Sequence, residues 1–240
     1  MSQFYNAGFT CPTPWLKGGA AFDPIDISSL SEWFDYRVNG ALASGDPVGS
    51  WAGKKNVYTL TGSGTSRPTW TADDGDGRPA ILLDGVNDAL ACGILNSVLF
   101  GTTGSFEFIF VAKLSSVQNN LGGYFSSTGI TNQIGASAYQ DTSLVFSMGG
   151  SSHFGVALWD NTWHVIRCKK DGSRRVVEID GSVVYDNTTI AGPYGTGLDT
   201  LAIGEYFGQR MTGSFRHWMA FTEPLDDATA AALTTYLTTA

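Results

Sequence analysis

Three short segments of the sequence place an aromatic side chain beside amide and carboxylate groups, a combination suited to binding sugars. They are Tyr139-Gln140-Asp141, Trp159-Asp160-Asn161 and Tyr185-Asp186-Asn187, each at an expected strand end. An aromatic ring offers a sugar an apolar platform, and the polar groups hydrogen-bond its hydroxyls. The same compositions are common in turns, and aromatic residues mostly serve burial, so we favour packing. The candidate sugar-binding residues are Tyr139, Trp159, Asp160, Asn161 and Tyr185.

A turn rich in Asp and Gly, at residues 73–79, holds the carboxylates of Asp73, Asp74 and Asp76. Closely spaced carboxylates are oxygen ligands of the kind that Ca²⁺ prefers. The turn lacks the distal Glu of an EF-hand loop, and Asp and Gly are common in plain turns. We therefore predict a solvated turn, no metal site and no cofactor. Asp84 or Asn87 would be the further ligands if calcium did bind.

The charge and composition of the chain argue against several classes of protein. Its 240 residues carry 14 Lys and Arg against 22 Asp and Glu, a net charge of −8. A nucleic-acid partner is not expected, because the chain has little from which to build a basic face. A membrane partner is not expected either, because no apolar stretch approaches the ~20 residues of a membrane span. Three Cys without a CxxC pair indicate free thiols rather than a zinc site or a disulfide framework.

Glycines and alternating apolar residues predict short strands joined by tight turns. The chain has 30 Gly, well above the usual ~7%. Residues 106–112 are apolar at nearly every position, which predicts a central strand covered on both faces. Asp171-Gly172 and Asp180-Gly181 predict hairpin turns between strands at 163–169, 174–179 and 182–185. Other strands are expected at 33–36, 80–84, 122–125, 133–138, 144–148, 201–206 and 215–221, with loops at 40–51 and 61–68.

The N-terminal segment differs from the body of the chain. Residues 1–26 carry aromatic side chains separated by Gly, Pro, Thr and Asn, with neither strand nor helix periodicity. This pattern predicts an extended arm, which either packs on its own domain or binds a partner. The first residues also lack the basic and apolar regions of a signal peptide. The residues expected to bind a partner are Phe4, Tyr5, Phe9 and Trp15.

A single domain is expected over residues 27–240, ending in one helix at about 226–238. Asp226 or Asp227 is the expected N-cap, because a side-chain carboxylate can accept the first free backbone N–H groups. Apolar residues near helical spacing predict a stripe that packs on the sandwich. The stripe consists of Leu225, Ala228, Ala232, Leu233, Tyr236 and Leu237.

The order of several short motifs is familiar from one superfamily. Asp84-Gly85 ends an apolar strand, the Phe-rich strand 106–112 and Trp163-His164-Val165-Ile166 follow, and Glu223-Pro224-Leu225 leads into the final helix. Over about residues 30–238 this series resembles the laminin-G-like branch of the concanavalin A-like lectin/glucanase superfamily. The resemblance implies an all-β, two-sheet antiparallel jelly-roll sandwich closed by the C-terminal helix. His217 departs from it, because such domains often carry an acidic residue there.

The resemblance raises the question of catalysis, because the superfamily includes glucanases. Those enzymes carry carboxylates on one face of a strand, as nucleophile and general acid. Glu178-Ile179-Asp180 matches the first half of such a motif. The continuation, Gly181 to Val184, contains no second Glu, and Asp180-Gly181 suits a hairpin turn. We therefore predict that the chain is not an enzyme.

A lone acidic, glycine-rich sandwich with an aromatic arm looks like the structural proteins of bacteriophage virions that carry this domain. The first hypothesis is a non-catalytic virion protein, a head decoration, fibre or tail component, made in the host cytoplasm. Its expected partners are capsid or tail proteins and copies of itself, as a trimer. The alternative is a glycan-binding adhesin or lectin module for a host glycan, assisted by calcium. A glycoside hydrolase is the third hypothesis.

Overall fold

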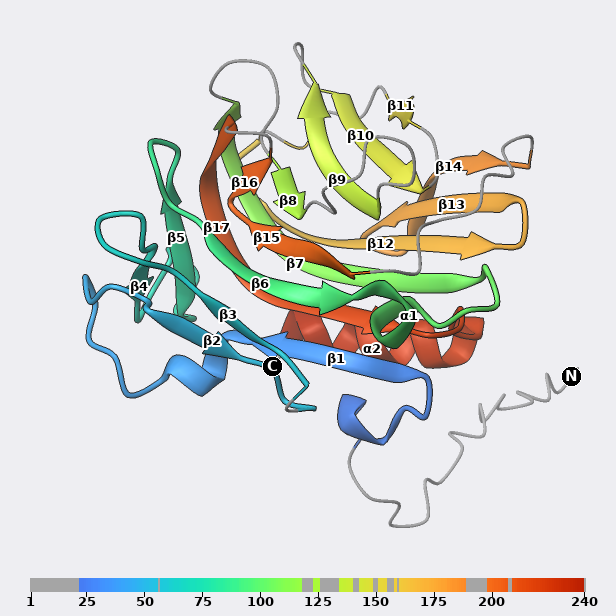
Figure 1. The fold of residues 1–240 in the computed structure, drawn as a ribbon, viewed down its shortest axis with the longest axis horizontal. Helices are drawn as coiled ribbons and strands as arrows, with labels where there is room; N and C mark the ends of the chain where they lie inside the picture. Colours follow the sequence, from blue (N-terminus) through green and yellow to red (C-terminus); the bar gives the residue numbers. More distant parts are fainter. Residues whose placement is uncertain are drawn as a thin grey trace, which may run out of the picture.

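The computed structural model describes residues 22–55, 57–117, 123–125, 134–139, 143–148, 151–154, 158, 160–188, 198–206 and 209–239. Its largest part is a nine-stranded antiparallel sheet, the main sheet, ordered β14-β13-β12-β7-β17-β5-β4, with β1 and β16 also paired to β17 (Figure 1). The strands are β14 (Ser182–Asn187), β13 (Arg174–Ile179), β12 (Trp163–Asp171), β7 (Phe106–Val117), β17 (Gln209–Phe221), β5 (Ala80–Asp84), β4 (Thr69–Thr71), β1 (Leu30–Asp35) and β16 (Glu205–Tyr206).

Two four-stranded antiparallel sheets complete the sandwich (Figure 1). One is ordered β15 (Leu198–Ile203), β6 (Leu90–Leu95), β3 (Thr59–Thr61) and β2 (Ser50–Ala52). The other is ordered β11 (Ser151–Phe154), β10 (Ser143–Met148), β9 (Ile134–Tyr139) and β8 (Gly123–Phe125). The predicted all-β antiparallel sandwich is therefore confirmed.

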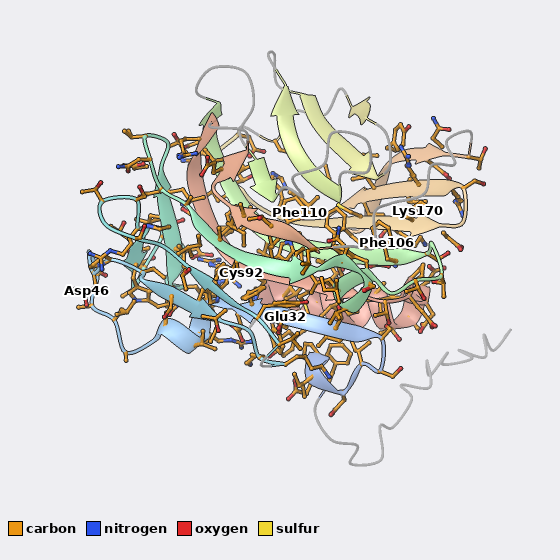
Figure 2. All side chains as sticks on the ribbon, in the orientation of Figure 1. Glu32, Asp46, Cys92, Phe106, Phe110 and Lys170 are labelled. Atoms are coloured by element: carbon orange, nitrogen blue, oxygen red, sulfur yellow. The ribbon has the colours of Figure 1, made fainter. Side chains whose placement is uncertain are left out.

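Strand β7 is buried on both faces, as the sequence predicts. Phe106 and Phe110, labelled in Figure 2, belong to the core cluster that also includes residues of β6 and β15. The alternate residues Ile109 and Val111 belong to a second cluster on the opposite face. Alternation along one strand thus supplies both apolar layers, and helix α2 (Asp227–Thr239) covers the second of them. The face under α2 is called the outer face of the main sheet.

Helix α2 begins where an N-cap was expected. The Asp226 carboxylate accepts hydrogen bonds from the backbone N–H and the hydroxyl of Thr229, at 2.9 and 2.7 Å. The buried helix residues are Ala230, Leu233 and Leu237. The predicted stripe was wrong at Ala228, which is exposed. Because positions 230, 233 and 237 contact the sheet, Ala228 lies on another side of the helix.

Several short elements fall where loops were expected or where nothing was predicted. Strand β2 begins at the end of the expected loop 40–51, and β3 ends where the expected loop 61–68 begins. Helix α1 (Asn96–Phe100) and the 3₁₀ helices η1 (Pro24–Asp26) and η2 (Tyr36–Asn39) are also short. Three to five residues are too few to establish a periodicity. In the described part of the chain, no helix is long and apolar enough to cross a membrane.

Candidate functional site

A groove of about 370 Å³ crosses the outer face of the main sheet beyond the end of α2. Lys113 lies in its floor and shares a face of β7 with Ile109 and Val111, which α2 covers. We call this hollow the sheet-face groove. Its lining comes from β4, β5, β7 and β17, which are neighbours in the sheet, and from two loops. The lining residues are Thr69, Asp74, Leu82, Leu83, Asp84, Lys113, Ser115, Asn161, Thr212, Gly213 and Ser214.

The floor of the groove depends on a close approach of β17 to β7. The pairing of these strands shifts register between Thr212 and Gly213. A Cβ atom at position 213 would collide with the backbone carbonyl oxygen of Lys113. Glycine at this position therefore allows the two strands to meet where the neighbouring residues Thr212 and Ser214 line the groove.

The lysine of the groove is already paired. Lys113 Nζ lies 2.6 Å from Asp74 Oδ2 and donates a hydrogen bond to the Asp74 carbonyl oxygen at 2.7 Å. Both side chains are 15% exposed, so water screens the pair only in part. The charges of Lys113 and Asp74 therefore cancel within the groove.

Asp84 is the groove's other carboxylate. Its Oδ1 accepts hydrogen bonds from the backbone N–H groups of Val86 and Asn87, at 2.7 and 3.2 Å. Burial acts to raise the pKa of Asp84, but these N–H donors outweigh it and hold the pKa below its ordinary value. Burial raises the pKa of the neighbouring Asp88, which is 5% exposed. Among the described residues, the ionised carboxylate of Asp84 therefore forms no ion pair with a lysine or arginine, whereas Asp74 pairs with Lys113.

One wall of the groove is formed by the loop before β12. Asn161 has a left-handed backbone with φ of 58°, and its N–H donates to the Leu114 carbonyl oxygen at 3.0 Å. Asn tolerates this conformation better than most residues. The Asp160 carboxylate accepts hydrogen bonds from the backbone N–H and hydroxyl of Thr162, at 3.0 and 2.7 Å. These bonds fix Asn161 against the end of β7.

His164 ties this loop to the β13–β14 turn. Its Nδ1 lies 2.7 Å from an Asp180 oxygen and its Nε2 lies 3.1 Å from an Asp160 oxygen. Only the doubly protonated ring donates to both carboxylates. Partial burial acts to lower the pKa of His164, but the two carboxylates outweigh it and raise the pKa above its ordinary 6.5. The charged ring therefore links the Asn161 loop to the β13–β14 turn.

Trp163 is the aromatic side chain beside the groove. Its ring lies under the Arg216 guanidinium, 3.7 Å from the ring centroid, and Lys113 Nζ lies 5.7 Å away. Arg216 is held by the Pro79 carbonyl oxygen at 3.0 Å and by the Asp76 carboxylate at 2.8 Å. These bonds to Arg216 lower the pKa of Asp76. Trp163 was not among the predicted binding residues.

The structure brings together only part of the predicted sugar-binding set. Asn161 lines the groove and Asp160 supports its loop. Tyr185, on β14, packs against the main core instead. Tyr139 ends β9, and its side chain is outside the described residues. Trp159 and the arm residues Phe4, Tyr5, Phe9 and Trp15 also lie outside the described residues.

The remaining carboxylates singled out in the sequence have protein partners. Asp73 Oδ1 accepts the N–H groups of Gly75 and Gly77, both at 2.8 Å, as in a turn. Glu178 pairs with Arg167 at 2.8 Å, whereas Asp180 has a left-handed backbone and binds His164. Across the described ranges, no group of three or more His, Cys, Asp or Glu side chains is placed to hold a metal ion.

Sequence reasoning missed Lys113, Ser115, Thr212 and Ser214. One signal was available, because the face of β7 that carries Ile109 and Val111 becomes polar again at Lys113 and Ser115. Such a change predicts that the covering layer ends there. The contributions of β17 and β5 depend on register, which no local pattern in the sequence reveals.

Comparison with known proteins finds similar folds at low identity. No protein-family model and no curated protein sequence matches the chain. Domain 4 of AbnA, a GH43 extracellular arabinanase from Geobacillus stearothermophilus solved with arabinotriose, has a TM-score of 0.64 and 13% identity, covering 86% of this chain and 98% of that one. The binding domain of Paraclostridial Mosquitocidal Protein 1 has a TM-score of 0.64 and 12% identity, covering 88% and 53%.

Trypanosoma rangeli sialidase, solved with sialic acid, has a TM-score of 0.63 and 9% identity. The match covers 92% of this chain but 34% of the sialidase, so the chain corresponds to about a third of that enzyme. These matches extend across most of the sandwich, and their identities are too low to carry a function. The chain thus shares its β-sandwich fold with the matched parts of these three proteins.

Proposed function

We propose that this chain is a non-catalytic carbohydrate-binding module whose ligand occupies the sheet-face groove. The observation that carries the proposal is the mixture of groups in one hollow. Ser115, Ser214, Asn161 and the Asp84 carboxylate line this hollow together with Leu82. Hydroxyl, amide and carboxylate groups match the hydrogen-bonding pattern of a sugar, and a leucine supports its apolar face.

The volume of the groove and the fold of the chain support this proposal. A volume of about 370 Å³ lies within the range of ordinary small-molecule sites, ~300–1,000 Å³. A neighbour in fold, domain 4 of the arabinanase, was solved with arabinotriose. Glycoside hydrolysis uses two carboxyl groups flanking the bond. In this groove Asp74 is paired with Lys113, which leaves Asp84 as the carboxylate there without a lysine or arginine partner.

Isothermal titration with neutral oligosaccharides, arabinotriose first, tests the proposal. We expect Asn161→Gly and Ser115→Ala each to weaken binding by about 2- to 12-fold, because a neutral hydrogen bond contributes ~0.5–1.5 kcal/mol. Glycine at 161 keeps the left-handed backbone while removing the amide. The matched control is Ser97→Ala on α1, outside the groove lining. Absence of binding across a broad panel would refute the module, and unchanged affinity of both groove variants would refute the site.

The same module could be displayed on a bacteriophage particle, and we keep this as the proposed setting. It rests on the aromatic arm, of which residues 1–21 lie outside the described part of the chain. Deleting residues 1–22 should abolish incorporation into virions while the sandwich still folds. Normal incorporation of the truncated chain would contradict this setting and leave the sugar site untouched.

A further inference from the structure

Basic side chains around the sheet-face groove are paired with acidic ones. Lys113 is bound to Asp74, and Arg216 is bound to Asp76. Arg210, which acts electrostatically on Asp88, pairs with Glu205 at 2.7 Å. Lys113, Arg216 and Arg210 therefore each have a carboxylate of the protein, whereas the Asp84 carboxylate is held ionised by backbone N–H groups.

This arrangement of charges disfavours the binding of an anionic ligand. It would bring a second negative charge beside Asp84 in a partly enclosed space, where like charges repel more strongly than in water. It could gain Lys113 only by displacing Asp74, and Asp74 would then remain 15% exposed without its cation. A net charge of −8 on the chain adds a weaker, salt-screened repulsion.

An uncharged sugar meets none of these costs. Its hydroxyls can donate to the Asp84 carboxylate and accept from the Asn161 amide, and the Lys113–Asp74 pair stays intact. Hydrogen bonds to an ionised acceptor are stronger than those between neutral groups. The same carboxylate that repels an anion therefore favours a hydroxyl donor.

We propose that the sheet-face groove selects by charge, accepting uncharged saccharides and rejecting those that carry a carboxylate, such as sialic and uronic acids. This inference rests on the proposed function of the groove. It separates this chain from the ligand of its sialidase neighbour, because that protein was solved with sialic acid. The deciding group is the carboxylate of Asp84.

The test compares two sugars that differ in the carboxylate, trigalactose and trigalacturonate, by titration at low and physiological salt. We expect wild-type protein to bind the neutral sugar at least tenfold more tightly, with the gap narrower at higher salt. Asp84→Asn should narrow this ratio to about threefold or less by strengthening binding of the acidic sugar. Asparagine keeps the Oδ1 acceptor for Val86 and Asn87, so the turn is retained, and an unchanged unfolding midpoint checks this.

Asp171→Asn is the matched control. It removes one negative charge at the far end of β12, eight residues or ~26 Å from Trp163. The affinity ratio should stay at the wild-type value in this variant. Charge selection would be overturned if wild type bound trigalacturonate as tightly as trigalactose or more tightly. It would also be overturned if Asp84→Asn left the ratio of the two affinities unchanged. Either result would leave the proposed function standing. Binding of neither sugar, together with absence of binding across the panel of neutral oligosaccharides, would overturn the proposed function and this inference with it.

Discussion

Replacing Glu107 with Gln removes the charge that anchors the start of α2 to the main sheet. Glu107 is fully buried, and its carboxylate accepts hydrogen bonds from the Arg167 guanidinium and from the Leu225 N–H at 3.0 Å. Arg167, 5% exposed, also pairs with Glu178 at 2.8 Å and donates to the Leu225 carbonyl oxygen. One arginine therefore joins β7, β13 and Leu225, which lies two residues before the helix.

The size of the effect follows from these contacts. Removing one partner of a buried ion pair costs about 3–5 kcal/mol, because the other charge stays buried without compensation. Glu178 remains as a partner for Arg167, although it is 17% exposed and partly screened. We therefore expect the lower end of that range, about 3 kcal/mol of unfolding free energy. At a urea m-value of ~3 kcal/mol per M, the midpoint should fall by about 1 M.

Urea unfolding followed by circular dichroism measures this shift. The control is Asp186→Asn, which breaks the exposed Arg174–Asp186 pair, a contact of 2.7 Å with both side chains largely in water. This variant should unfold at nearly the wild-type urea concentration, because exposed pairs contribute little. A midpoint shift in Glu107→Gln no larger than that of the control would refute the reasoning.

Two further variants test the groove and its loop. Gly213→Ala should lower the unfolding free energy by about 1–3 kcal/mol and weaken sugar binding, because its Cβ would collide with the Lys113 carbonyl oxygen. The control is Gly93→Ala, which should change neither property because the space around Gly93 is open. Equal effects of the two variants would contradict the packing argument. His164 has a raised pKa, so its stabilising contribution is fully present below pH 6.5 and is lost as pH rises through the raised value. The difference in unfolding midpoint between wild type and His164→Gln should therefore be larger at pH 6 than at pH 9. A difference that does not depend on pH would count against the charged link.

Much of the fold can be predicted from sequence because its longest elements carry strong local patterns. β5 and β13 have the predicted bounds, since β5 is an apolar run that ends in an Asp-Gly turn and β13 lies between the Asp-Gly turns at 171–172 and 180–181. β2, β3 and β4 have three residues each and no period to detect. Their positions are set by pairing with strands elsewhere in the chain.

The candidate site, too, could be predicted from the sequence only in part. Asn161 could be identified because it lies in a loop of unusual local composition, next to an aromatic residue and a carboxylate. Lys113 and Thr212 are 99 positions apart in the sequence and come together only through the pairing of β7 with β17. Residues gathered by the register shift at Gly213 cannot be found by reading one segment at a time.

The stack of Arg216 on Trp163 gives the groove an optical reporter. Trp33, Trp51, Trp70 and Trp218 are at most 2% exposed and packed in the interior, whereas Trp163 is partly exposed beside the groove with a guanidinium over its ring. Indole emission responds to nearby charge and to water. Of these five tryptophans, Trp163 is therefore the one whose fluorescence should change when a ligand enters, so that binding can be followed without a label.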